Sequence, residues 1–286
     1  MDIKSEDSAK KNVANLEKED FVVQELKEKQ AQKHPQAPFN TSSLQQEANK
    51  KLGFSAKQTM KIAQELYEGV NISGKNTGLI TYMRTDSCNL SEKFTMQVKN
   101  WLIANLGKEY AEETPRKFKT KTRSAQEAHE AIRPTLAGRT PEQASEHLNR
   151  NQFKLYDLIW KRAVACQAKP AIVEQTQAII KAGSAIFKAS GNIMVFDGFT
   201  KIYGIDSKDV VLPKIKEGEK LNLKELKPDQ HFTEPPARYS DATLVKALEE
   251  YGIGRPSTYA PIISTIIERG YVDRDENKKF KPTEVA

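Results

Sequence analysis

The sequence has few of the residues that build metal sites or disulfide frameworks. It contains two cysteines, Cys88 and Cys166, and four histidines, and their spacing matches neither a zinc site nor a set of disulfides. We therefore expect no metal site in this chain and a reducing, cytoplasmic environment. No apolar run approaches the roughly 20 residues that cross a bilayer, and the first residues lack the apolar core of a signal peptide. These absences disfavour the membrane and secreted classes of protein.

What the sequence does contain is charge, with a positive excess. Charged residues make up 29% and hydrophobic residues 38% of 286 positions, and the net charge is +7 with a pI near 9.1. A chain of this length can hold about two domains with a sizeable core. The positive charge suits a polyanionic partner such as nucleic acid, although ribosomal or membrane-surface contacts would be served equally well.

Apolar spacing and capping signals predict a helical region over residues 41–168. Apolar residues recur three and four positions apart there, and a glycine follows several of these stripes. The predicted helices are 42–52, 55–68, 94–106 and 151–167. Ser42 and Gln45 form a capping-box pattern at the start of the first helix, and Ser55 with Gln58 repeats it at the start of the second. Met60, Ala63 and Tyr67 lie on one apolar face of the second helix.

The flanking regions have other patterns. Residues 1–18 are polar and predict a loose lead-in, which a strand at 21–26 and a connector over 29–38 follow. Residues 171–227, rich in Val, Ile, Phe and Thr, predict a β meander joined to that first strand. The predicted strands of the meander are 177–182, 185–189, 193–196, 200–203 and 220–223. Residues 233–286 predict helix, glycine turn, helix and hairpin, the outline of a winged helix-turn-helix.

The stretch of residues 78–87 combines groups suited to covalent chemistry on a phosphate. An apolar run leads to Tyr82, and Arg84 and Asp86 follow within four residues. A phenol loses its proton only near pH ~10, so a nearby cation that favours phenolate and holds a phosphate would make the tyrosine a better nucleophile. The alternative is a buried strand that ends in a solvated turn.

Two further stretches could hold phosphates. Ser124 can begin a short helix that places His129 and Arg133 on one face, although His129 taken alone is better explained as a structural histidine. The loop 116–123 contains five cations and could either touch phosphates or be simply solvated.

The start of the last predicted helix carries Arg255, Ser257 and Thr258. Free backbone N–H groups and the helix dipole make such a start an anion site. A plain helix cap explains Ser257 as well but leaves Arg255 unexplained. Arg269, in the last turn of that helix, could complement the helix dipole or contact nucleic acid.

Residues 69–76 nearly match a nucleotide-binding P-loop. However, Asn76 replaces the Ser or Thr whose hydroxyl would bind Mg²⁺, and a helix rather than a strand is predicted before it. Nucleotide binding at this stretch is therefore rejected.

Four stretches resemble, in the same order, motifs of one enzyme family. They are PFNTSSLQQEA at 38–48, GLITYMRTDS at 78–87, AHEAIRPT at 128–135 and the run 238–272 that contains GIGRPSTYA. The family is the type IA DNA topoisomerases. The methionine between Tyr82 and Arg84 favours its bacterial topoisomerase I branch over topoisomerase III or reverse gyrase. The resemblance covers roughly residues 20–286.

The resemblance implies a multidomain α+β fold that forms part of a toroid. Residues 1–40 would be a polar lead-in plus the first strand of a β-rich arch, and 41–168 the helical domain with the active-site tyrosine. Residues 169–232 would complete the arch, and 233–286 would be a truncated, helix-turn-helix-like DNA-binding segment.

The resemblance also implies an activity, the transient cleavage and religation of single-stranded DNA that relaxes negative supercoils without ATP. Tyr82 would be the nucleophile that takes the 5′ phosphate, and Arg84 and His129 would assist cleavage. The residues expected to contact DNA are Asp86, Arg133, Arg255, Ser257, Thr258 and Arg269. The competing hypothesis is a non-catalytic, winged-helix-type DNA-binding protein with Tyr82 buried in a core.

Members of this family bind Mg²⁺ through carboxylates of a Toprim domain, and no stretch of this chain resembles that domain. We therefore expect a fragment, or one part of a split enzyme, that lacks the Mg²⁺ ligands. Its expected partners are single-stranded segments of negatively supercoiled DNA in the nucleoid and a Toprim domain in cis or in trans. Alone, it is expected to bind DNA but to relax supercoils poorly.

Overall fold

The computed structural model describes residues 3, 5–118, 129–204 and 209–286, which fall into two compact units. The first unit comprises Met1–His34, Pro170–Gly198 and Ile205–Pro235, and the second comprises Pro35–Lys169, Phe199–Gly204 and Pro236–Ala286. Among the described residues, no helix has the length and apolar character needed to cross a membrane.

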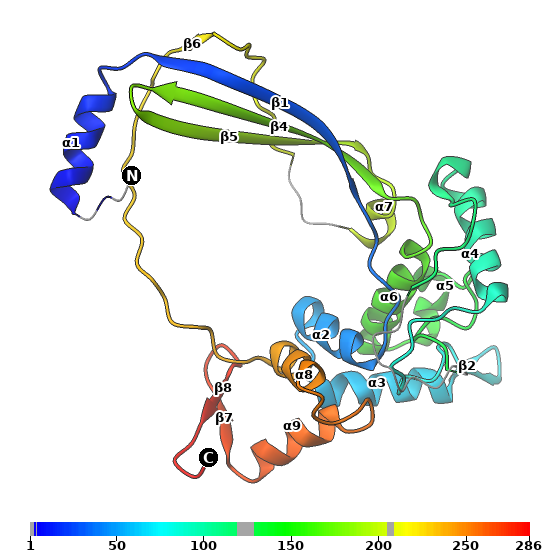
Figure 1. The fold of residues 1–286 in the computed structure, drawn as a ribbon. Helices are drawn as coiled ribbons and strands as arrows, with labels where there is room; N and C mark the ends of the chain where they lie inside the picture. The colour runs from blue at the N-terminus through cyan, green and yellow to red at the C-terminus, as the bar shows by residue number, and fades with distance from the viewer. Residues whose placement is uncertain (1–2, 4, 119–128, 205–208) are drawn as a thin grey trace. The chain divides into compact units, whose positions relative to one another are not determined.

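The first unit is built on an antiparallel sheet of four strands in the order β5-β4-β1-β6. Its strands are β1 (Phe21–Lys33), β4 (Ala171–Ala182), β5 (Ala185–Phe196) and the short β6 (Lys220–Leu221). Figure 1 shows β1, β4 and β5 as long strands that run side by side. Because Phe21 pairs with Ala182, the predicted union of the early strand with the β-rich region is confirmed.

Several expectations for this unit were wrong. The lead-in contains helix α1 (Glu6–Leu16), which Ser5 caps and an exposed Glu6–Lys10 ion pair supports. Strand β1 continues to Lys33, through part of the predicted connector, because each of its last residues has a pairing partner on β4. In place of the strands predicted at 177–182, 185–189 and 193–196, the meander has two strands of 12 residues, and β6 covers the first half of the strand predicted at 220–223.

The second unit is mainly helical. Its elements are α2 (Thr41–Leu52), α3 (Ala56–Glu68), β2 (Val70–Ile72), β3 (Lys75–Thr77), α4 (Glu92–Asn105), η1 (Lys108–Tyr110), α5 (Pro141–Ala144), η2 (Ser145–His147), α6 (Arg150–Ala165) and α7 (Thr200–Tyr203). The four predicted long helices are thus confirmed. The predicted strand at 200–203 is wrong, because these residues form α7.

Local signals account for most of the helix ends. Ser55 accepts a hydrogen bond from the Gln58 N–H and caps α3 as predicted, and Gly53 ends α2 with a left-handed φ of 69°. The predicted cap of α2 was wrong, since Asn40 rather than Ser42 forms the capping box. The P-loop-like stretch is the β2–β3 hairpin, whose turn residues Ser73 and Gly74 both have positive φ.

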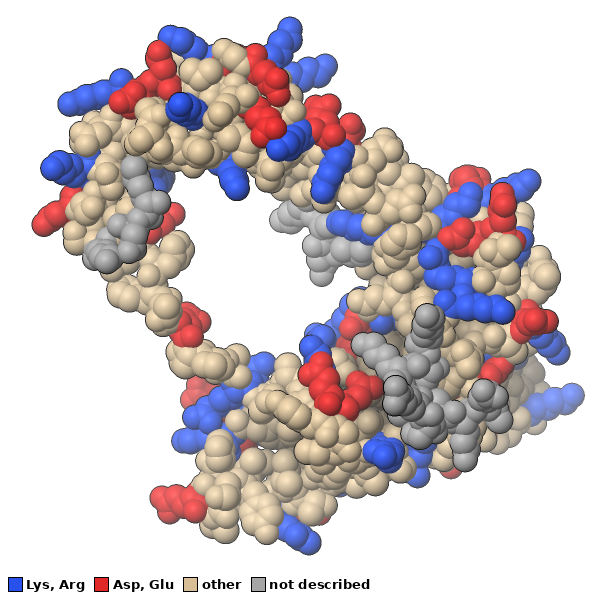
Figure 2. Space-filling view, viewed as in Figure 1, with Lys and Arg blue, Asp and Glu red and all other residues tan. Residues whose placement is uncertain are grey.

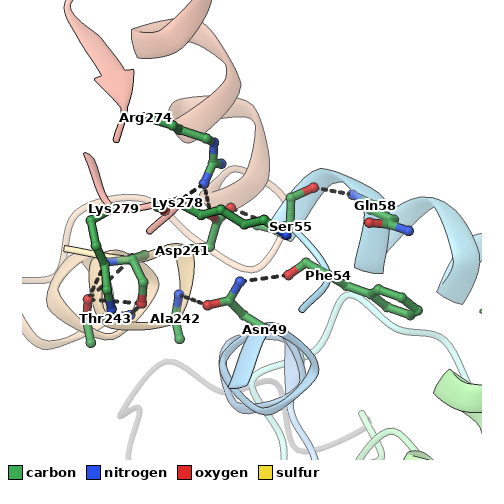
Figure 3. A network of polar contacts seen from close by, with 12 residues as sticks. Asn49, Phe54, Ser55, Gln58, Asp241, Ala242, Thr243, Arg274, Lys278 and Lys279 are labelled. Atoms are coloured by element: carbon green, nitrogen blue, oxygen red, sulfur yellow. Dashed lines mark hydrogen bonds and ion pairs between the residues drawn. The ribbon is translucent and has the colours of Figure 1, made fainter. Parts of the chain in front are cut away.

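The C-terminal part of the second unit has the predicted outline of helix, turn, helix and hairpin. Its elements are α8 (Asp241–Glu250), α9 (Tyr259–Glu268), β7 (Val272–Arg274) and β8 (Phe280–Pro282). The buried carboxylate of Asp241 links these elements: it accepts a hydrogen bond from the Ala56 N–H and pairs with Arg274 at 2.6 Å (Figure 3). The hairpin and the start of α3 are therefore held to α8 by one side chain.

Charge is mixed on both units. Figure 2 shows Lys and Arg side chains interspersed with Asp and Glu on the visible face of each unit. The positive excess of the sequence is therefore not gathered into one patch on that face, and the candidate site has to be located from its geometry.

Candidate active site

Tyr82 lies at the surface of the second unit. Its side chain is 44% exposed, whereas Leu79, Ile80 and Met83 around it are buried. Arg84 is exposed as well, because alternate residues of this extended segment face outward. The alternative of a tyrosine sealed in a core is contradicted by this exposure.

The segment before Tyr82 is fixed by Thr81. The Thr81 N–H donates to the carbonyl of Arg133 at 2.9 Å, and its hydroxyl donates to the carbonyl of Ala131 at 2.7 Å. In return the Arg133 N–H donates to the Thr81 hydroxyl at 3.0 Å. The residues just after His129 therefore run beside the tyrosine segment, although the two stretches lie about fifty positions apart in sequence.

The segment after Tyr82 is fixed by Thr41, the first residue of α2. The Thr41 hydroxyl is 2.7 Å from the Met83 carbonyl and accepts a hydrogen bond from the Thr85 N–H at 2.9 Å. The Thr41 N–H donates to the Thr85 carbonyl at 2.9 Å. Because both backbone neighbours of Arg84 are held, the direction of its exposed side chain is restricted.

The ring of Tyr67, at the end of α3, meets the ring of Tyr82. The ring centroids are 5.2 Å apart in an edge-on arrangement, and Tyr67 is itself 41% exposed. The backbone of the returning chain also passes close to Tyr67 at Gly78, where a Cβ would lie 2.8 Å from the Tyr67 carbonyl oxygen. The expectation that Tyr67 belongs to the buried face of its helix was therefore wrong.

Two hollows lie along α3 near this site, and Tyr82 lines the first of them. The first, of about 440 Å³, is lined by Met60, Lys61, Gln64, Glu68, Tyr82 and Arg84. The second, of about 360 Å³, is lined by Lys57, Met60 and Arg84 on one side and by residues from Pro256 to Glu268 on the other. Arg84 thus lies between the predicted nucleophile and Ser257, which also lines the second hollow.

The predicted helix through His129 and Arg133 was wrong for the described residues. Residues 129–135 are extended, since Ile132 pairs with Phe39 and Pro134 with Ile80. His129 is exposed at the start of this stretch. Ser124 and most of the basic loop 116–123 lie outside the described residues, and Arg116 is paired with Glu112.

The guanidinium of Arg133 is engaged within the protein. Its Nε donates to Glu130 at 2.9 Å, its Nη1 donates to the Pro134 carbonyl at 3.0 Å, and it stacks 4.6 Å from the centre of the Phe94 ring. These contacts hold the 129–135 stretch and leave little of the side chain exposed.

The start of α9 differs from the prediction in its capping. Thr258 rather than Ser257 occupies the N-cap position, and its hydroxyl accepts from the Arg255 N–H at 2.7 Å. Burial raises the pKa of the Tyr259 phenol. The negative charges of Glu249 and Asp86 raise this pKa further, whereas the positive charge of Arg255 lowers it. Asp86 and Arg255 are thus both within electrostatic range of one phenol.

Arg269 is the exposed C-cap of α9. It lies at the opposite end of that helix from Arg255 and is absent from the lining of both hollows. The structure brings Tyr82, Arg84 and Ser257 to adjoining hollows, and Arg269 does not join them.

The metal-ligating side chains near the tyrosine do not form a site. Over residues 3, 5–118, 129–204 and 209–286 there is no group of three His, Cys, Asp or Glu suited to hold a metal ion. The Glu68 carboxylate in the first hollow accepts from the Gln64 amide at 2.5 Å. The donors that the structure describes therefore do not fit a Mg²⁺ site beside Tyr82.

Comparison with known proteins decides the family. The family model described as DNA topoisomerase matches residues 1–286. The chain belongs to this family. The DNA topoisomerase 1 of Rickettsia felis is 48% identical over 290 residues, with 99% of this chain and 37% of that protein covered. The DNA topoisomerase 1 of Campylobacter jejuni is 46% identical over 286 residues, with 100% of this chain and 41% of that protein covered.

A solved topoisomerase structure agrees. The full-length topoisomerase I from Thermotoga maritima matches with a TM-score of 0.85 and 38% identity, over 99% of this chain and 45% of that chain. The resemblance to bacterial DNA topoisomerase I is therefore confirmed, and the chain spans well under half the length of the curated relatives named above.

Sequence reasoning missed two residues of this candidate site. Thr41 lies inside one of the four resembling stretches, but its anchoring role requires knowing that α2 begins beside Met83 and Thr85. Tyr67 was assigned to the core from helical spacing, and no local signal places its ring against Tyr82.

Proposed function

We propose that this chain supplies the tyrosine nucleophile and part of the DNA-binding surface of a type IA DNA topoisomerase. The observation that carries the proposal is the position of Tyr82: it is exposed between two threonine-anchored segments and shares a hollow with Arg84. DNA is the substrate that membership of the topoisomerase family implies.

The proposed reaction is a transesterification. The Oη of Tyr82 attacks a backbone phosphorus of single-stranded DNA, the P–O3′ bond breaks, and the phenolic proton ends on the released 3′ hydroxyl. One phosphodiester replaces another, so the bond energy is conserved and the reverse attack by the 3′ hydroxyl reseals the strand without ATP. Negative supercoils relax while the strand is open.

The residues around Tyr82 and at the start of α9 have separate proposed roles. Arg84 stabilises the charge that develops on the phosphorus, a preorganised electrostatic effect made possible by the anchoring of its backbone neighbours. His129 assists cleavage from the adjoining stretch. Arg255, Ser257 and Thr258 bind the strand near the start of α9, Asp86 orients this region, and Arg269 contacts DNA farther away.

Arg133 was predicted to contact DNA, and its bonds to Glu130 and Pro134 favour a different role. We assign it to holding the extended stretch that positions His129. The Mg²⁺ of the complete enzyme would be held by carboxylates of a Toprim domain, in cis or in trans, so this chain alone would relax supercoils poorly.

The test is a trapped adduct. A single-stranded oligonucleotide labelled at its 3′ end is incubated with the chain, Mg²⁺ and a Toprim domain supplied in trans, and the protein is denatured. The label should stay on the protein, a 5′-end label should leave with the other fragment, and Tyr82→Phe should abolish the adduct with DNA binding intact. An adduct that persists in Tyr82→Phe would place the nucleophile elsewhere.

The competing function is a non-catalytic DNA-binding protein that uses the outline formed by α8, α9 and the β7–β8 hairpin. That hypothesis needs Tyr82 in a core, which its exposure argues against. DNA binding without any adduct under the conditions above would favour it.

A further inference from the structure

The hollow beside Tyr82 and its neighbour share Met60 and Arg84 in their linings and both lie along α3; together they are called the α3 groove. The sequence motifs account for Tyr82 and Arg84 at one end and for Ser257 at the other. The α3 residues between these ends belong to no motif, and none of them was predicted to have a function.

The α3 side of the groove is suited to a phosphate. Lys61 is exposed in the hollow that contains Tyr82, and among the described residues its side chain has no ion pair or hydrogen bond. The acidic residues of the groove are already in contact with other side chains. Glu68 accepts a hydrogen bond from Gln64, and Glu268 lies 3.7 Å from Lys57 in a largely exposed pair.

The position of Lys61 also fits a strand that passes Tyr82. Met60 forms an apolar part of the lining shared by both hollows, and Lys61 follows it on the side of the tyrosine. A flexible ammonium group at the edge of a groove can reach a backbone phosphate without reading the base.

We propose that Lys61 of α3 contacts a backbone phosphate of the single strand that Tyr82 cleaves, and so adds a binding residue to the site from the α3 groove. The proposal rests on the proposed function, because it takes the strand that Tyr82 cleaves as the ligand. It assigns a binding role to α3, which so far only supplied packing.

The test measures affinity against salt. Fluorescence anisotropy of a labelled single-stranded oligonucleotide is recorded from 50 to 200 mM salt for the full chain carrying Tyr82→Phe, with and without Lys61→Ala. One lost phosphate contact should lower the salt slope by about 0.7 and weaken binding about fivefold at 0.1 M salt. Lys108→Ala, an exposed lysine outside the groove, is the matched control and should change neither quantity.

A second measurement needs no substitution. Lysine acetylation of the unchanged chain, read by mass spectrometry, should slow at Lys61 when the oligonucleotide is present and stay constant at Lys108. An unchanged salt slope in Lys61→Ala, an equal effect of Lys108→Ala, or failure of the chain to bind the oligonucleotide would overturn the proposal.

These outcomes are independent of the cleavage test. The Tyr82→Phe background removes the proposed nucleophile, so the binding measurement does not require adduct formation. If no adduct forms but Lys61→Ala lowers the salt slope, the cleavage reaction is rejected and the phosphate contact of Lys61 stands. If the adduct forms but Lys61→Ala leaves the salt slope unchanged, only the phosphate contact is rejected.

Discussion

Thr41 and Thr85, which are 44 positions apart, are joined by two hydrogen bonds of 2.9 Å. The Thr41 N–H donates to the Thr85 carbonyl, and the Thr85 N–H donates to the Thr41 hydroxyl. Both side chains are buried, so water cannot replace these partners easily. The start of α2 therefore helps to fix the backbone on either side of Arg84 and so the direction of its side chain.

Replacing Thr41 by valine should test this anchor. The change keeps the shape of the side chain but leaves the buried Thr85 N–H without its partner, which costs roughly 1–3 kcal/mol. We expect the midpoint of urea unfolding to fall, and adduct formation to slow with DNA affinity little changed. Thr41→Ser, which keeps the hydroxyl, should recover most of the unfolding midpoint and most of the rate of adduct formation. Equal unfolding midpoints for Thr41→Val and the unchanged chain would refute the anchor.

Tyr67→Ala should slow adduct formation without weakening DNA binding. An aromatic pair is worth about 0.5–1.5 kcal/mol, so losing the ring that meets Tyr82 should cost about two- to tenfold in rate. Tyr67→Phe should restore the rate, because the contact is made by the ring. Tyr251→Ala, a highly exposed tyrosine elsewhere, is the control. Single-turnover trapping measures the rate, and a loss of affinity alone would contradict a positioning role.

The Asp241–Arg274 pair should contribute strongly to stability. Asp241 is 2% exposed, and Arg274→Ala would leave its carboxylate buried with the Ala56 N–H as its remaining hydrogen-bond partner among the described residues. We expect a loss of about 3 kcal/mol in urea unfolding, at the lower end for a broken buried pair because Arg274 is partly exposed. Lys246→Ala breaks an exposed pair with Glu250 and should cost well under about 1 kcal/mol. Similar losses in the two variants would show that burial of Asp241 is unimportant.

Cys166 should make stability fall at alkaline pH. Burial raises the pKa of its thiol from 9.0 to about 12, so the unfolded chain loses this proton before the folded chain does. The stabilising effect is complete below pH 9 and is lost progressively as the pH rises toward 12, with a loss on the order of 1 kcal/mol by pH 10. The difference between the unfolding free energies at pH 8 and at pH 10 should therefore be smaller in Cys166→Ala than in the unchanged chain. An identical pH dependence in both proteins would mean that the thiol ionises normally.

Sequence reasoning worked best where a signal is local. Ser55 and Gly53 mark helix ends by capping chemistry that depends on a few neighbouring residues, and both ends were predicted correctly. The exposure of Tyr82 was inferred from chemistry and resemblance, and the structure agrees. The helix outline of residues 241–268 also followed from caps and glycines.

Tertiary contacts explain the failures. The stretch after His129 is extended because Phe39 and Ile80 provide backbone partners from distant positions, which outweighed its helical appearance. Strand β1 is longer than its sequence indicates because β4 pairs with it to Lys33. Tyr67 has the spacing of a core residue, yet its ring lies at the surface against Tyr82, a residue that the chain brings to it from beyond the β2–β3 hairpin.

The β2–β3 hairpin begins and ends at nearly the same point of the structure. It leaves α3 and returns at almost the same place, since the Leu79 N–H donates to the Leu66 carbonyl at 2.8 Å. Residues inserted at its tip, around Ser73, would therefore leave the spacing between Tyr67 and Tyr82 unchanged. A fluorophore attached there could report strand capture and release while the tyrosine pair stays intact.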